Sequence, residues 1–183
     1  MKQITLAGVA LALAVATGNA VAAGGPTAGS FGLNIGVTRA TTQMGTPADF
    51  MITGKYLMTK DTAILAGLGL NMADNGQSTN NKYTKTGFMG GIRKYLKTDD
   101  LSPFVGGRIQ YMSTRDPNTV DVTDFALLAE VGAEYFLGKQ FSLEGSVGGG
   151  YTSQETKNPG SATSTKATGF GTATFSLSAN FYF

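Results

Sequence analysis

The sequence predicts an all-β protein, an eight-stranded antiparallel up-and-down transmembrane β-barrel. Three observations predict it. Eight segments alternate apolar and polar side chains with the period of two that a β-strand requires. Their connections alternate between short and long, and the amino terminus has the pattern of a secretory signal peptide. A secreted soluble sandwich is the alternative, because half-buried antiparallel strands alternate in the same way.

The amino-terminal segment has the features of a secretory signal peptide. Lys2 precedes the apolar run ITLAGVALALAVA, and Ala20 and Ala22 form a small-x-small cleavage pattern. The run is short for a membrane-spanning helix, so we predict a cleaved signal peptide over residues 1–23. A barrel domain then occupies residues 24–183. A helix retained in the mature protein is the alternative.

The composition suits a chain whose outer surface meets lipid. Charged residues make up 14% of the sequence, against about 25% in ordinary soluble domains, and 26 of the 183 residues are glycine. The net charge of +2 gives no electrostatic footprint for nucleic acid. No run after the signal peptide reaches the roughly 18 apolar residues of a membrane helix, so a membrane-spanning mature protein must be a closed barrel.

The first four predicted strands are residues 30–38, 48–59, 62–72 and 82–96. Their outward side chains are predicted to be Phe31, Leu33, Ile35, Val37, Phe50, Ile52, Tyr56, Met58, Ile64, Ala66, Leu68, Leu70, Phe88 and Ile92. Asp49 and Lys55 face inward on the second strand, and Lys85 and Arg93 on the fourth. The fourth strand is the least regular, and a bulge near Tyr95 would change its phase.

The last four predicted strands are residues 102–112, 124–137, 141–151 and a closing strand from about Lys166 to Phe183. Outward side chains are predicted at Val105, Ile109, Tyr111, Phe125, Leu127, Ala129, Val131, Ala133, Tyr135, Phe141, Leu143, Val147, Tyr151, Phe175, Leu177, Ala179, Phe181 and Phe183. Most strands are close to the 9–11 residues or so that a tilted strand needs to cross a membrane. Aromatic residues near the strand ends are placed as interfacial girdles.

The connections fall into two classes. Short turns are predicted at residues 60–61, 97–100 and 138–140. Longer polar loops are predicted at residues 39–47, 73–81, 113–123 and 153–165. Outer-membrane barrels have short periplasmic turns and longer external loops. The pattern therefore predicts that both chain ends lie on the periplasmic side.

The chain resembles the small outer-membrane barrels of the OmpA transmembrane-domain and OmpX type. The signal peptide, the eight alternating strands, the strand start SPFVGGRIQY and the final FYF carry the resemblance. It implies localisation in the cell outer membrane, with an envelope-structural or adhesion-like role. It also implies that the closing strand is the signal read by the barrel assembly machinery. That assembly signal comprises Phe175, Leu177, Phe181 and Phe183.

Six inward charges are the candidate functional residues. An eight-stranded interior is just wide enough for side chains to fill it, so inward charges on different strands are predicted to pair across the lumen. This predicted lumen charge network comprises Lys55, Arg93, Arg108, Glu130, Glu134 and Glu144. We interpret it as a structural plug. A narrow channel or a lateral conduit for small apolar solutes is the alternative function.

The sequence offers few residue types that commonly carry out catalysis. The chain has no histidine and no cysteine, which removes Ser-His-acid triads, imidazole-based metal sites and thiolate chemistry. We therefore predict that the protein is not an enzyme and has no cofactor and no metal. We also predict that it is monomeric and has no nucleic-acid partner. Outer-membrane lipid and lipopolysaccharide are its expected partners. The residues placed to meet lipopolysaccharide phosphates are Lys82, Lys85, Arg115, Lys157 and Lys166.

Overall fold

The computed structural model describes residues 27–40, 49–74, 82–115, 121–158, 163–171 and 174–183. The predicted signal peptide, residues 1–23, lies outside these ranges, as do the side chains of Asp49 and Phe50. Within them, no helix is long and apolar enough to cross a membrane.

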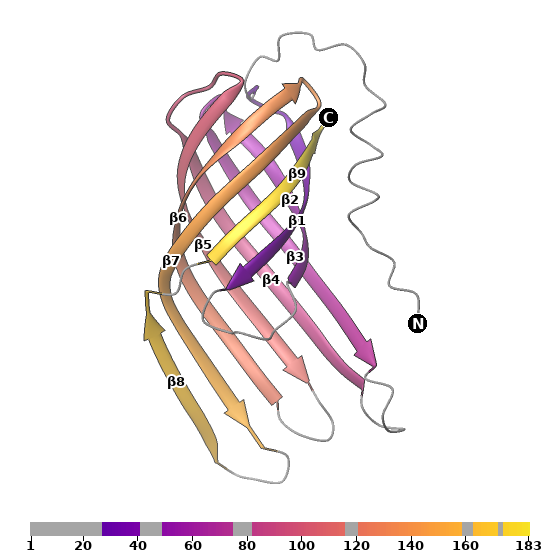
Figure 1. Ribbon diagram of the computed structural model, residues 1–183, viewed down its shortest axis with the longest axis vertical. Helices are drawn as coiled ribbons and strands as arrows, with labels where there is room; N and C mark the ends of the chain where they lie inside the picture. The colour runs from indigo at the N-terminus through magenta and orange to yellow at the C-terminus, as the bar shows by residue number, and fades with distance from the viewer. Residues whose placement is uncertain (1–26, 41–48, 75–81, 116–120, 159–162, 172–173) are drawn as a thin grey trace.

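The described residues form nine β-strands, all paired antiparallel. The strands are β1 (Phe31–Ala40), β2 (Asp49–Thr59), β3 (Thr62–Asp74), β4 (Lys82–Tyr95), β5 (Leu101–Arg115), β6 (Asp121–Gly138), β7 (Phe141–Lys157), β8 (Ser164–Phe170) and β9 (Thr174–Tyr182). Each strand from β1 to β7 pairs with the next, and β9 pairs with both β7 and β1. The described strands therefore close a ring of eight, which confirms the predicted barrel (Figure 1).

The closing strand is not continuous from Lys166, as the sequence had predicted. β8 ends at Phe170, Gly171 has a φ of 98°, and β9 begins at Thr174. Phe170 of β8 pairs with Tyr151 of β7, and Thr174 of β9 pairs with Gly148 of β7. The segment that joins β8 to β9 therefore has one residue more than the part of β7 that it spans. That extra residue, as in a β-bulge, shifts the phase, so Phe170 and Phe175 both face outward although five positions separate them.

The strands on one side of the barrel are longer than predicted. β6 has 18 residues and β7 has 17, and β8 pairs with β7 along Ser164–Phe170. Residues 113–115, 121–123 and 153–157 were predicted as loop, but they lie in strands because cross-strand pairing continues to Asp121–Lys157. We call residues 113–115, 121–124, 152–157 and 164–170 the outer sheet extension. Figure 1 shows β8 beside β7, beyond the end of β9.

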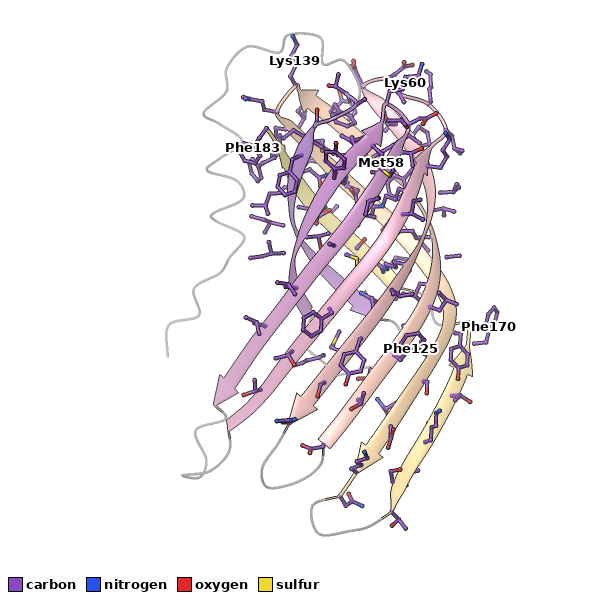
Figure 2. The ribbon with its side chains drawn as sticks, turned by 180° about the vertical axis from the view of Figure 1, so that it is seen from behind. Met58, Lys60, Phe125, Lys139, Phe170 and Phe183 are labelled. Atoms are coloured by element: carbon purple, nitrogen blue, oxygen red, sulfur yellow. The ribbon has the colours of Figure 1, made fainter. Side chains whose placement is uncertain are left out.

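The outer surface carries an apolar band between two aromatic levels. Tyr135 and Phe125, both exposed, mark these levels on β6. The ten-residue separation along a strand tilted by about 40° gives a band about 25 Å tall, the height expected of the lipid-facing band of an outer-membrane barrel. Figure 2 shows Lys60, Lys139 and Phe183 at the short-turn end, with Phe125 and Phe170 farther toward the loop end. The band accounts for the exposed apolar side chains without a soluble sandwich core.

The lumen is apolar at the short-turn end. Six buried side chains form what we call the apolar cluster: Leu57, Ala63, Tyr95, Phe104, Phe136 and Tyr182. Tyr95 packs edge-to-face on Phe104, with ring centroids 5.9 Å apart. The pairing of β4 with β5 is regular through Tyr95, so there is no bulge there, and Arg93 and Tyr95 both face inward.

Two glycines on neighbouring strands provide a test of how tightly this lumen is packed. A Cβ at Gly132 would overlap the carbonyl oxygen of Gly145 and the ring of Phe104, whereas a Cβ at Gly145 would meet nothing within 4 Å. We predict that Gly132→Ala lowers the free energy of unfolding by about 1–3 kcal/mol through overpacking. Gly145→Ala, the matched control, should change it by less than about 0.5 kcal/mol. Urea unfolding in detergent micelles measures both, and equal midpoints would contradict the packing described.

Candidate functional site

The six predicted lumen charges lie together in the middle of the barrel, and we call them the charged layer. Lys55 comes from β2, Arg93 from β4, and Arg108 from β5. The carboxylates come from the neighbouring strands β6, which carries Glu130 and Glu134, and β7, which carries Glu144. All six are buried, the most exposed being Arg108 at 6%. Their inward direction follows from the period of two along each strand.

Lys55 neutralises two carboxylates that strand register places side by side. Glu134 and Glu144 are directly paired residues of β6 and β7. Without a cation, two such carboxylates would repel each other in a medium with little water. The Lys55 Nζ lies 2.9 Å from Glu134 Oε2 and 2.8 Å from Glu144 Oε2, and it donates a hydrogen bond to each. One ammonium therefore joins β2 to β6 and β7 across the lumen.

Arg93 contacts Glu144 as well and connects it to the third carboxylate, Glu130. Its Nε donates to Glu130 Oε1 at 2.6 Å, and its Nη1 lies 2.6 Å from Glu144 Oε2. The guanidinium also lies over the ring of Phe104, 4.2 Å from the centroid. Arg93 thus connects the charged layer to the apolar cluster beneath it.

Glu134 is the residue on which most of the hydrogen bonds converge. Besides Lys55, it accepts hydrogen bonds from the hydroxyls of Tyr95 at 2.5 Å and Tyr182 at 2.6 Å, and from Asn180 Nδ2 at 2.9 Å. The Ser142 hydroxyl also donates to it. A buried carboxylate with this many donors is well compensated for the loss of water.

Four further residues of the site were not predicted from the sequence: Tyr95, Ser142, Asn180 and Tyr182. Ser142, Asn180 and Tyr182 belong to the polar faces of their strands, so their inward direction was predictable. Convergence on Glu134 depends on the stagger of strands around the ring, which no single strand pattern reveals.

Arg108 is the least compensated cation of the charged layer. Its Nη1 lies 3.5 Å from Glu130 Oε2, whereas Arg93 approaches Glu130 at 2.6 Å. Its Nη2 donates to the Thr174 hydroxyl at 3.0 Å, and its buried Nε has no hydrogen-bond partner within the described residues. A cavity of about 30 Å³ lies beside Arg93, Arg108 and Glu144, which is enough space for water.

The lumen widens beyond Arg108 toward the loop end. A cavity of about 500 Å³, which we call the vestibule, is lined mainly by β4, β5, β6, β7 and β8. Lys85 lines the vestibule, so the structure places it inside the barrel and not on the outer surface where lipopolysaccharide would be met. Arg115, Lys157 and Lys166 are exposed, and the side chain of Lys82 lies outside the described residues.

The four residues of the predicted assembly signal lie on the outer face of β9 and at the chain end. Phe175, Leu177 and Phe183 are exposed, and Phe181 packs against Phe141 with ring centroids 5.2 Å apart. The opposite face of β9 carries Asn180 and Tyr182 into the charged layer. This strand therefore has a lipid-facing side and a side that contributes to the charged layer.

The charged layer contains three cations and three carboxylates, and its hydrogen bonds connect these groups to one another. Within the described residues, no group of three or more potential metal ligands is arranged to hold a metal ion. The geometry described is that of an internally neutral plug between an apolar cluster and an open vestibule.

Comparison with known proteins gives the fold. No protein-family model and no curated protein matches the chain. Among solved structures, the outer membrane protein AlkL in lipid bilayers is similar, with a TM-score of 0.57 and 14% identity over 92% of this chain and 97% of that one.

Two proteins of Pseudomonas aeruginosa are also similar. OprG matches with a TM-score of 0.54 and 13% identity, covering 87% of this chain and 98% of that one. The amino-terminal β-barrel domain of OprF matches with a TM-score of 0.52 and 14% identity, covering 85% and 98%. The chain has the fold of the small eight-stranded outer-membrane barrels.

Removing Glu134 tests the charged layer. We predict that Glu134→Ala lowers the free energy of unfolding by about 3–5 kcal/mol, because Lys55 loses a buried partner and several donors lose their acceptor. The matched control is Glu155→Ala in the outer sheet extension, where solvent screens the exposed ion pair with Lys157, so the substitution should leave the unfolding temperature nearly unchanged. Thermal unfolding in detergent measures both, and an unchanged unfolding temperature for Glu134→Ala would contradict the description.

Proposed function

We propose that this chain, which has the fold of the small eight-stranded outer-membrane barrels, is an integral outer-membrane protein with an envelope-structural or surface-interaction role and no enzymatic activity. The observation that carries the proposal is the filled lumen. The apolar cluster and the charged layer together occupy the short-turn half of the barrel with buried side chains. Any binding of another molecule is therefore assigned to the loop end of the barrel.

The filled lumen argues against the channel alternative. A conducting path needs a continuous column of water or of weak sites, and here Lys55 and Arg93 each contact two carboxylates across the lumen. Below them, Tyr95, Phe104 and Tyr182 are almost fully buried. An ion would have to displace these paired charges and then cross the apolar cluster.

The outer sheet extension supports a surface-interaction role. β8 is exposed along its whole length, and within the described strands it pairs only with β7. An unpaired strand edge presents backbone donors and acceptors to another chain. Its outward side chains at Lys166 and Thr168 are polar, as expected of a sheet that extends past the lipid.

The remaining parts of the proposal concern location and partners. The apolar band of about 25 Å fits outer-membrane lipid, and the exposed Arg115, Lys157 and Lys166 are suited to lipopolysaccharide phosphates. We propose that the barrel is monomeric and that the barrel assembly machinery reads the outward face of β9. The chain's lack of histidine and cysteine supports a non-enzymatic role.

Planar-bilayer recording tests the closed lumen. We predict that the refolded protein gives no steady current at voltages where a large general porin, used as the positive control, conducts. Arg108→Ala should also give no steady current, because the apolar cluster remains closed beneath the charged layer. A steady wild-type current that changes with Arg108→Ala would instead support the channel alternative.

A further inference from the structure

The vestibule has the size of a small-molecule site. Its volume of about 500 Å³ lies within the roughly 300–1,000 Å³ of ligand pockets in proteins. It opens toward the loop end and is closed below by the charged layer.

The walls of the vestibule are apolar near its floor. Strand pairing sets Arg108 opposite Leu128, Gln110 opposite Ala126, and Met112 opposite Asp124. Leu128, Ala126 and Met112 therefore form a strip of apolar side chains that rises from the level of Arg108 toward the loop end. Such a strip accommodates a short hydrocarbon chain by removing its surface from water.

Polar groups bound this apolar strip at the loop end. Asp124 accepts a hydrogen bond from Gln154 Nε2 at 2.8 Å, and both side chains line the vestibule with Lys85. Asp124, the one carboxylate among the described residues that line the vestibule, is thus engaged by a neighbour.

Arg108 does not line the vestibule itself, but it lies next to Gln110 on the inward face of β5 and bonds to Thr174, and both of these residues line the floor. Thr174 lines the floor and accepts a hydrogen bond from Arg108 Nη2, and Gln110 lines both the vestibule and the small cavity beside Arg108. Arg108 is buried, its only ion pair is at 3.5 Å, and its Nε lacks a partner within the described residues. A guanidinium with this little compensation attracts an anion strongly where water is scarce.

We propose that the vestibule binds a small amphipathic carboxylate. The hydrocarbon chain lies along Met112, Ala126 and Leu128, and the carboxylate rests on the floor at Thr174 and Gln110, toward the Arg108 guanidinium. The guanidinium is the donor that recognises the head group, because the Thr174 hydroxyl already donates to the Gly148 carbonyl oxygen at 3.4 Å and accepts from Arg108. A neutral or cationic molecule with the same chain lacks the attraction to Arg108.

Methionine-methyl NMR of the protein in lipid nanodiscs tests the proposal. Nanodiscs are used because a detergent is itself an amphiphile. Octanoate is the probe, with octan-1-ol and octylamine as neutral and cationic controls at neutral pH. Met112 lines the vestibule, whereas Met58 lies exposed on the outer surface near the short-turn end and reports partition into lipid (Figure 2). Octanoate should shift the Met112 resonance saturably and leave Met58 unchanged.

Variants separate the head group from the cavity. Arg108→Gln should weaken octanoate binding by about tenfold or more, with little change for octan-1-ol, and Arg108→Lys should restore much of the affinity. Ala126→Phe, which fills the vestibule without removing a charge, should abolish the binding of both molecules. Thermal unfolding of each variant establishes that it is folded, and Ala126→Phe supplies the test if Arg108→Gln is not.

Three outcomes would overturn the proposal. Equal affinities for octanoate and octan-1-ol would mean that the carboxylate is not recognised. An octanoate affinity unchanged by either Arg108→Gln or Ala126→Phe would place the ligand elsewhere. Parallel, non-saturating shifts of Met112 and Met58 would show partition into the bilayer only.

Discussion

The narrow lumen is the constraint on which the rest of the structure depends. A ring of eight strands leaves room for side chains and little water, so an ionised side chain that points inward must find its partner among the others. Glu134 and Glu144 face each other because register requires it, and Lys55 supplies the one ammonium that both share. The charged layer is therefore a consequence of barrel closure, and each of its members depends on strands distant in sequence.

Closure of the backbone ring and completion of the charged layer depend on the same strand. β9 forms the last pairing, with β1, and it also brings Asn180 and Tyr182 to Glu134. Until β9 is in place, Glu134 lacks two of its donors, and β1 and the Phe141–Gly148 part of β7 each have an unpaired edge. When β9 pairs with its neighbours, its inward side chains reach Glu134 and its outward side chains reach the lipid-facing surface. Both faces of the strand therefore find their partners in the same step.

The sequence predicted well what depends on alternation. The barrel, the outward faces and the six inward charges followed from the period of two, because each strand reports its own two faces. Features that depend on neighbouring strands were missed. The extra residue near Gly171 reverses the phase of β8, and the polar residues of 153–157 alternate too weakly to indicate a strand without their partners on β6. The cluster around Glu134 required the stagger of five strands, which no local pattern contains.

The two halves of the lumen differ in character along the barrel axis. Residues that stabilise the barrel lie in one half, and residues available for function lie in the other. The apolar cluster and the charged layer occupy the short-turn half, where their side chains are buried and a substitution acts first on stability. The vestibule and the outer sheet extension occupy the loop half, where side chains border open space and can change with little effect on the ring. Arg108 lies at the boundary, because it contacts Glu130 on one side and Thr174 on the other. A residue in that position belongs both to the plug and to whatever the vestibule binds, so it is the point at which binding at the loop end would act on barrel stability.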